Sequence, residues 1–86
     1  MEHYLGERYL PAAARGDIGD ESDRLQSAAR TLGAVRLLQT LYVPRDEICL
    51  YLFEADSADL VSRAAAAAAI ALEHVQLVDA SLTVPA

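Results

Sequence analysis

Two apolar stretches separated by only four residues constrain this chain more than any other feature of its sequence. The stretches VRLLQTLYV and ICLYLFEA occupy Val35–Val43 and Ile48–Ala55, and PRDE connects them. Both are rich in aliphatic and aromatic side chains, which favour β-strands, and a short polar connection between two such stretches is typical of a β-hairpin. The sequence therefore predicts two adjacent antiparallel strands over 35–43 and 47–54.

The hairpin loop sets which side chains share a face of the sheet. With a four-residue loop, Val43 lies opposite Ile48, and the pairing continues to Leu38 opposite Phe53. Since alternate residues of a strand point to opposite faces, the side chains fall into two sets. A mostly aliphatic set is expected to face the helices: Leu37, Gln39, Leu41, Val43, Ile48, Leu50 and Leu52. An aromatic set with a few polar groups is expected on the other face: Leu38, Thr40, Tyr42, Cys49, Tyr51 and Phe53.

The remaining segments predict two more strands and two helices. The segment 11–20 contains proline and glycine and is expected to be a loop. Leucine and alanine then recur with helical spacing until Gly33, which indicates a helix. Ser57 is expected to be the N-cap of a second helix, which contains a run of alanines. The expected strands are 2–10, 35–43, 47–54 and 73–82, and the expected helices are 20–32 and 57–71.

These elements follow one another as strand, helix, strand, strand, helix, strand. This βαββαβ order is typical of the ferredoxin-like fold of the α+β class, in which two helices cover one face of a four-stranded antiparallel sheet. The chain has 86 residues and no internal linker, which predicts a single domain over 1–86. The second face of the sheet is left open.

Charge and cysteine content exclude several classes of protein. The chain has 13 acidic and 7 basic residues and a formal net charge of −6, whereas nucleic-acid-binding proteins need a basic surface. The single cysteine, Cys49, cannot form an intrachain disulfide and is typical of a reducing cytosol. The apolar run Ala64–Leu72 is about half as long as a membrane span, and the charged start is unlike a secretory signal. We expect a soluble cytoplasmic protein that binds neither nucleic acid nor membrane.

The aromatic set is too apolar to face water across an open sheet, in a chain whose hydrophobic fraction is 53%. The expected cover is a second copy of the chain, joined sheet to sheet in a two-fold homodimer that closes into a barrel. Aromatic walls with a few polar groups are typical of a small-molecule pocket. The interface therefore either encloses a ligand or is filled by its own side chains.

Two segments resemble a known family. YLGERYLP at 4–11 and VRLLQTLYVPRDEICLYLFEADSADLV at 35–61 are similar to the small bacterial nickel-binding-protein-like family, also called domain of unknown function 4242. Its members typically open with a Val-Glu-Arg-x-Leu-Pro strand and have a hairpin that ends in Cys-x-x-x-Glu-Ala-like residues before a helix. The resemblance covers most of the chain, is weakest over 12–34, and implies a dimeric ferredoxin-like α/β barrel.

The same resemblance bears on metal binding, because nickel-binding members carry histidines in the first strand and along the second helix. At the matching positions this chain has Arg8, Ala65 and Ala69. Neither arginine nor alanine is a nickel ligand, and His3, His74 and Cys49 do not have a spacing typical of a metal site. We expect no intrinsic nickel site and no cofactor.

The candidate pocket residues lie on the first strand and the hairpin. Alternation directs Glu7 and Arg8 to opposite faces, and the sequence leaves open which of them faces the barrel interior. Tyrosines can donate a hydrogen bond to a ligand or simply pack, whereas Cys49 is expected to be a small buried side chain rather than a nucleophile. The candidate ligand pocket consists of Glu7, Arg8, Tyr9, Thr40, Tyr42, Cys49, Tyr51 and Phe53.

Two functions of different classes follow. The first is a non-catalytic module that holds a small ligand inside a dimeric barrel. The second is a cofactor-free isomerase, cyclase or monooxygenase-like enzyme, with a carboxylate of Glu7 or Asp79 near Tyr42 or Tyr51. A third interpretation is a scaffold whose interface is closed. The sequence names no substrate and leaves open whether any reaction is catalysed.

Overall fold

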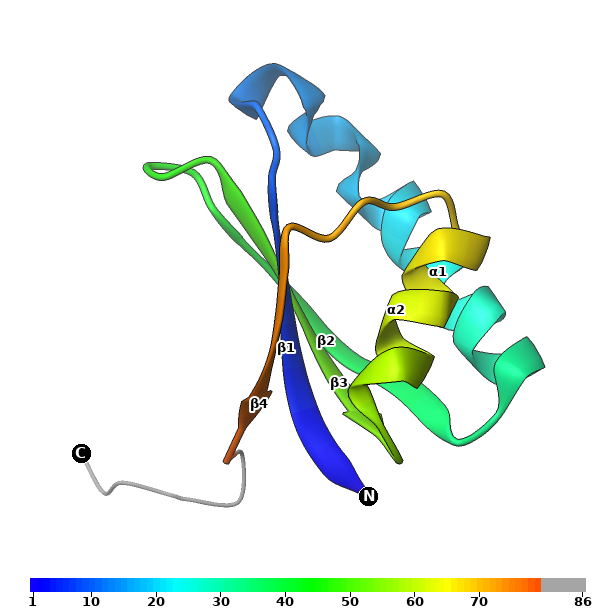
Figure 1. The fold of residues 1–86 in the computed structure, drawn as a ribbon. Coiled ribbons are helices and arrows are strands. Elements are labelled where there is room, and N and C mark those ends of the chain that lie inside the picture. Colours follow the sequence, from blue (N-terminus) through cyan, green and yellow to red (C-terminus); the bar gives the residue numbers. More distant parts are fainter. Residues whose placement is uncertain (80–86) are drawn as a thin grey trace.

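The computed structural model describes residues 1–79, which form a four-stranded antiparallel sheet with two α-helices packed on one face (Figure 1). The strands lie in the order β2-β3-β1-β4. The predicted ferredoxin-like α+β fold is therefore confirmed. The elements are β1 (Glu2–Tyr9), the 3-10 helix η1 (Ala12–Asp17), α1 (Ile18–Leu32), β2 (Val35–Val43), β3 (Ile48–Ala55), α2 (Ala58–Ala67) and β4 (His74–Val78).

Helical structure begins earlier than the sequence predicted. Pro11 precedes η1, whose first turn is closed by a hydrogen bond of 2.8 Å from the Ala14 N–H to the Pro11 carbonyl. The 3-10 helix continues directly into α1 at Ile18, so the predicted loop over 11–20 is wrong for most of its length. Three consecutive alanines after a proline favour helical backbone, and they outweigh the two glycines that follow.

The second helix is shorter than its alanine run predicts, because the chain leaves the helix inside that run. α2 ends at Ala67 rather than at residue 71. Ala69 has a left-handed φ of 59°, and the Ile70 N–H donates to the Ala65 carbonyl at 2.8 Å, as in a Schellman termination. Ile70 is buried in the core. Burial of this large side chain outweighs the preference of alanine for a longer helix.

The predicted hairpin register is confirmed over most of its length. Val43 pairs with Ile48, and the pairing continues without interruption to Gln39 opposite Leu52. The register then shifts, so that Leu37 rather than Leu38 lies opposite Phe53. A β-bulge at this point inserts Leu38 as an extra residue, which accounts for its exposure of 41%. In β4, strand structure ends at Val78 within the described residues, and the predicted continuation over 80–82 lies outside them.

The two faces of the hairpin are opposite to those predicted. Cys49, Tyr51 and Phe53 are fully buried beneath the helices, whereas the aliphatic residues between them are only partly buried. The assignment of the aliphatic set to the helices and the aromatic set to the open face is therefore wrong, except for Leu37, which lies opposite Phe53 and packs against the core as predicted. The core side of α2 presents small side chains such as Ala64 and Ala65. Large rings from the sheet are consequently needed to fill the space between the two layers.

A close approach at Gly6 brings the segment after α2 onto the sheet. A Cβ atom at this position would lie 2.9 Å from Leu72 Cδ1 and 3.4 Å from the ring of Phe53. Glycine therefore allows Leu72 to lie directly over β1 before the chain returns as β4. Among residues 1–79, none of the helices is both long enough and apolar enough to cross a bilayer.

Candidate functional site

The structure separates the predicted pocket residues into two groups on opposite faces of the sheet. Cross-strand pairs in an antiparallel sheet share a face. Arg8 pairs with Cys49, which in turn pairs with Tyr42, and this face is the one beneath the helices. The group on the helix side consists of Arg8, Thr40, Tyr42, Cys49, Tyr51 and Phe53. Only Glu7 and Tyr9 lie on the open face, so the eight residues do not form one pocket.

On the helix side, charged and hydroxyl groups connect the sheet to α1. Arg8 Nη1 donates to Glu21 Oε1 at 2.6 Å, and both side chains are largely buried. Ser22 and Thr40 share a hydrogen bond of 3.0 Å between their hydroxyls. These contacts attach α1 to β1 and β2, and they position the helix rather than form a ligand site.

The central polar groups of the helix side are inaccessible. Burial raises the pKa of the Cys49 thiol and the pKa of the Tyr51 phenol above their usual values. Both side chains have no exposed surface. The Tyr51 hydroxyl and Glu21 Oε2 are buried without a hydrogen-bond partner among residues 1–79. A neutral thiol and a neutral phenol in this position belong to the core, as the sequence predicted for Cys49.

The open face of the sheet carries a continuous aliphatic surface. Leu41, Leu50 and Glu7 occupy one cross-strand row, and Leu5 and Leu52 are paired in the next row. Leu41 is 47% exposed, and none of the helices in residues 1–79 covers this face (Figure 1). We call this surface the open-face strip: Leu5, Leu41, Val43, Ile48, Leu50 and Leu52.

Polar side chains border one end of the strip in a row across three strands. His3 on β1, Glu54 on β3 and Arg36 on β2 are cross-strand neighbours. Arg36 Nη2 donates to Glu54 Oε1 at 2.8 Å, and His3 Nε2 lies 3.7 Å from Glu54 Oε2. This row neutralises the Glu54 carboxylate at the margin of the apolar surface.

A second polar group borders the strip along β4. His74 is the direct cross-strand partner of Glu7, and Gln76 lies one row away on the same face. The Gln76 Nε2 donates to Glu7 Oε1 at 3.4 Å. Both histidines of the chain therefore lie on the open face, a position that was not predicted from the sequence. The signal that could have found them is the pairing of β1 with β4, because this register places His74 beside Glu7.

Tyr9 and Glu47 form a separate contact at the far end of β1. The Tyr9 hydroxyl donates to Glu47 Oε1 at 3.3 Å, and the Ala12 N–H donates to Glu47 Oε2 at 2.6 Å. The nearby carboxylate raises the pKa of the Tyr9 phenol. Since Glu47 itself has a positive φ of 53° in the hairpin loop, this contact fixes the loop against the start of η1. Tyr9 thus has a structural partner.

The predicted acid–base combination for an enzyme is not assembled. Glu7 lies on the open face, whereas Tyr42 and Tyr51 lie on the helix side. Asp79 follows β4 near His3, in a hollow at the end of the sheet opposite to Tyr42. No carboxylate of the predicted pair is therefore placed beside either tyrosine.

The positions that the family resemblance assigns to metal ligands have other roles. Arg8 is paired with Glu21, Ala65 is buried in the core, and Ala69 lies beyond the end of α2. Within residues 1–79, no group of three or more His, Cys, Asp or Glu side chains has an arrangement that could hold a metal ion. The expectation that the chain lacks a nickel site stays a prediction.

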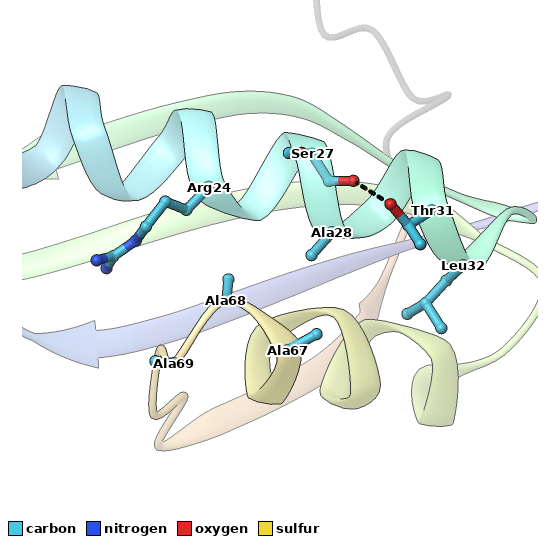
Figure 2. A pocket seen from close by; sticks show the side chains of 8 residues that line it. All are labelled: Arg24, Ser27, Ala28, Thr31, Leu32, Ala67, Ala68 and Ala69. Atoms are coloured by element: carbon cyan, nitrogen blue, oxygen red, sulfur yellow. Dashed lines mark hydrogen bonds between the residues drawn. The ribbon is translucent and has the colours of Figure 1, made fainter.

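A groove of about 570 Å³ lies on the outer side of the helix layer, between α1 and the C-terminal end of α2 (Figure 2). Its floor is made of small or apolar side chains, and Arg24 lies along one side. The Thr31 hydroxyl donates to the Ser27 carbonyl at 3.1 Å and is therefore engaged with its own helix. The lining residues are Arg24, Ser27, Ala28, Thr31, Leu32, Ala67, Ala68 and Ala69. None of the predicted site residues reaches this groove.

Comparison with known proteins supports the fold. No protein-family model matches the chain, and no curated protein sequence matches it either. Among solved structures, the chain is similar to SCO4226 from Streptomyces coelicolor A3(2), with a TM-score of 0.76 and 17% sequence identity over 88% of this chain and 94% of that one. At this identity the similarity shows the fold alone. The resemblance to the nickel-binding-protein-like family stays a prediction.

Proposed function

We propose that this chain works as a homodimer in which two open sheet faces pack against each other and hold a small ligand between them. The observation that carries the proposal is the open-face strip, an aliphatic surface that no described helix or strand covers. An aliphatic surface of this extent in so small a chain is typical of an interaction site. The proposal keeps the predicted dimer and replaces its predicted face with the aliphatic one.

The area of the open face is large enough for a small specific interface. The three longer strands have eight or nine residues, which at ~3.3 Å per residue is about 26 Å, and four strands are about 19 Å wide. The resulting plan area of about 500 Å² is increased by the relief of the side chains. Stable interfaces bury about 800 Å² on each partner. A second copy that covers the whole sheet therefore gives an interface at the lower end of the size range of specific complexes.

The composition of the face also favours a ligand between the two sheets. Aliphatic walls with a few polar groups at one side are typical of small-molecule sites. In the proposed dimer, each copy would contribute such a wall from its open-face strip, and Glu7, His74 and Gln76 would supply the polar groups. The enzyme alternative has less support, because its carboxylate and tyrosines lie on different faces.

Sedimentation equilibrium of the protein and of one charged variant tests the dimer. We expect a dimer at micromolar concentration, and we expect Leu50→Glu to give a folded monomer, because Leu50 is only partly buried within one chain. The matched control is Leu77→Glu. Leu77 is 61% exposed and pairs with Tyr4 on the helix side of the sheet, so this variant should stay dimeric. A wild-type protein that sediments as a folded monomer would exclude the proposal, and so would a Leu50→Glu variant that stays dimeric.

A further inference from the structure

We infer that Glu7, His74 and Gln76 form the polar subsite of the proposed ligand pocket, and that the subsite selects an organic cation, such as a primary ammonium group on an apolar body. The inference rests on the proposed dimer and adds the chemical class of its ligand. Three observations carry it: the hydrogen-bonding capacity left on Glu7, the charge around it, and the apolar side chains beside it.

Glu7 has hydrogen-bonding capacity that its neighbours do not use. Its Oε1 accepts one long hydrogen bond of 3.4 Å from Gln76, and among residues 1–79 no side chain donates to its Oε2. An ionised carboxylate can accept about four hydrogen bonds. His74 lies directly opposite, and its imidazole makes no hydrogen bond to another described side chain. The His74 imidazole adds two ring nitrogens that can take part in hydrogen bonds, so the subsite presents polar atoms beside the Glu7 carboxylate to whatever enters the pocket.

The charge of Glu7 must be compensated when the open faces close on each other. No basic side chain within residues 1–79 lies at ion-pair distance from it, since the described ion pairs of the open face involve Glu54 instead. Removal of an unpaired carboxylate from water is costly unless a cation or several donors replace the water. The chain has a net charge of −6, so its field attracts cations and repels anions. A ligand ammonium satisfies both conditions, because it brings a positive charge and three donors.

The neighbours of Glu7 define the rest of the ligand. Leu50 is the cross-strand partner of Glu7 on β3, and Leu5 lies two residues away on the same face of β1. An ammonium group bound to Glu7 would therefore have its carbon skeleton against aliphatic side chains. A ligand that combines an apolar body with one cationic end fits this pattern, whereas a small inorganic cation leaves the aliphatic surface unused.

The test compares three probes of similar size: 2-phenylethylamine, 2-phenylethanol and 3-phenylpropionate. Titration calorimetry with the intact protein should show that the amine binds at least about tenfold more tightly than the alcohol, and that the acid binds most weakly. Glu7→Gln, which keeps the shape of the side chain, should weaken amine binding about tenfold and leave alcohol binding nearly unchanged. Asp59→Asn removes the same charge from an exposed position on α2, and it should leave amine binding unchanged.

Two further readouts separate this inference from the dimer proposal. Sedimentation of each variant shows whether the dimer persists. A dimer that binds the acid as tightly as the amine, or that binds no amine at all, overturns the cation subsite and leaves the dimer standing. Amide chemical shifts on addition of amine to the wild-type protein should change most at Glu7, His74 and Leu50, which requires no variant. Changes confined to the groove between α1 and α2 would also overturn the inference.

Discussion

Glu7 and Arg8 are neighbours in β1, and their side chains serve opposite layers of the molecule. Glu7 accepts a hydrogen bond from Gln76 on the open face, while Arg8 passes to the other face and forms an ion pair of 2.6 Å with Glu21 of α1. The charge of Arg8 therefore stabilises the contact between helix and sheet, whereas the charge of Glu7 is available at the proposed interface. Alternation along a strand makes this division unavoidable.

The ion pair between Arg8 and Glu21 should contribute strongly to stability. Its side chains are only 20% and 10% exposed, so removal of one partner leaves the other charge buried and unpaired. We expect Arg8→Ala and Glu21→Ala each to lower the free energy of unfolding by about 3 kcal/mol, measured by urea denaturation. The double variant Arg8→Met/Glu21→Leu should recover most of this loss, because no unpaired charge then remains.

The control for this pair is Arg24→Ala. Arg24 and Asp20 form an exposed pair at 3.7 Å on the surface of α1, and the loss of such a pair should change stability by less than about 1 kcal/mol. If Arg8→Ala were as mild as Arg24→Ala, the buried pair would not hold α1 on the sheet.

Two tyrosine-to-phenylalanine variants should have opposite effects. The Tyr51 hydroxyl is buried without a partner among the described residues, so Tyr51→Phe removes an unsatisfied polar group and should raise the free energy of unfolding by about 1 kcal/mol. The Tyr42 hydroxyl donates to the Leu10 carbonyl at 2.8 Å, so Tyr42→Phe should lower it by about 1 kcal/mol. Thermal or urea unfolding measures the stability of both variants. A Tyr51→Phe variant less stable than Tyr42→Phe would contradict the conclusion that the Tyr51 hydroxyl lacks a hydrogen-bond partner and the Tyr42 hydroxyl has one.

Stability should decrease in alkaline solution. Burial raises the pKa of Cys49 from 9.0 and the pKa of Tyr51 from 10.0 in the folded protein. The unfolded chain then loses these protons at lower pH than the folded protein does, so it binds fewer protons and stability falls with rising pH. The stability that the protonated Cys49 and Tyr51 side chains contribute to the folded protein is fully present below about pH 9, and it is lost as the pH rises through their folded pKa values.

Urea denaturation at a series of pH values measures this dependence. The free energy of unfolding should be constant from neutral pH to about pH 9 and should then fall. The Tyr51→Phe and Cys49→Ala variants should each show a smaller fall. A wild-type stability that stays constant up to about pH 11 would be inconsistent with the burial of these groups.

The C-terminal end of α2 offers a test of backbone strain. Ala69 has a φ of 59°, a conformation that costs an L-residue about 1 kcal/mol and costs glycine almost nothing. We expect Ala69→Gly to raise the free energy of unfolding by about 0.5–1 kcal/mol. The matched control is Ala66→Gly, which changes an exposed alanine inside the helix and should lower stability by about 1 kcal/mol. Equal losses in the two variants would show that the helix does not terminate at this alanine.

Local sequence determined the elements and most of their pairing. The four-residue connection between β2 and β3 predicted Val43 opposite Ile48, and Ser57 was predicted as the N-cap of α2, where its hydroxyl accepts a hydrogen bond from the Leu60 N–H. Both features depend on residues within a few positions of one another, so loop length and capping chemistry suffice to predict them. The bulge at Leu38 was not predicted, because nothing in a run of apolar residues marks where one residue is extra.

Long-range packing selects which face of the sheet the helices cover. Alternation sorted Cys49, Tyr51 and Phe53 from the leucines between them, but it carries no information about the direction of the helices. That choice follows from volume, because the alanine-rich α2 leaves space that aromatic rings fill and leucines do not. The same long-range packing brings His74 beside Glu7, two residues 67 positions apart in the sequence. Local patterns therefore suffice to predict the fold and most of its register, whereas the composition of the open face, with its aliphatic strip and the polar side chains around Glu7, depends on how the two layers fit together.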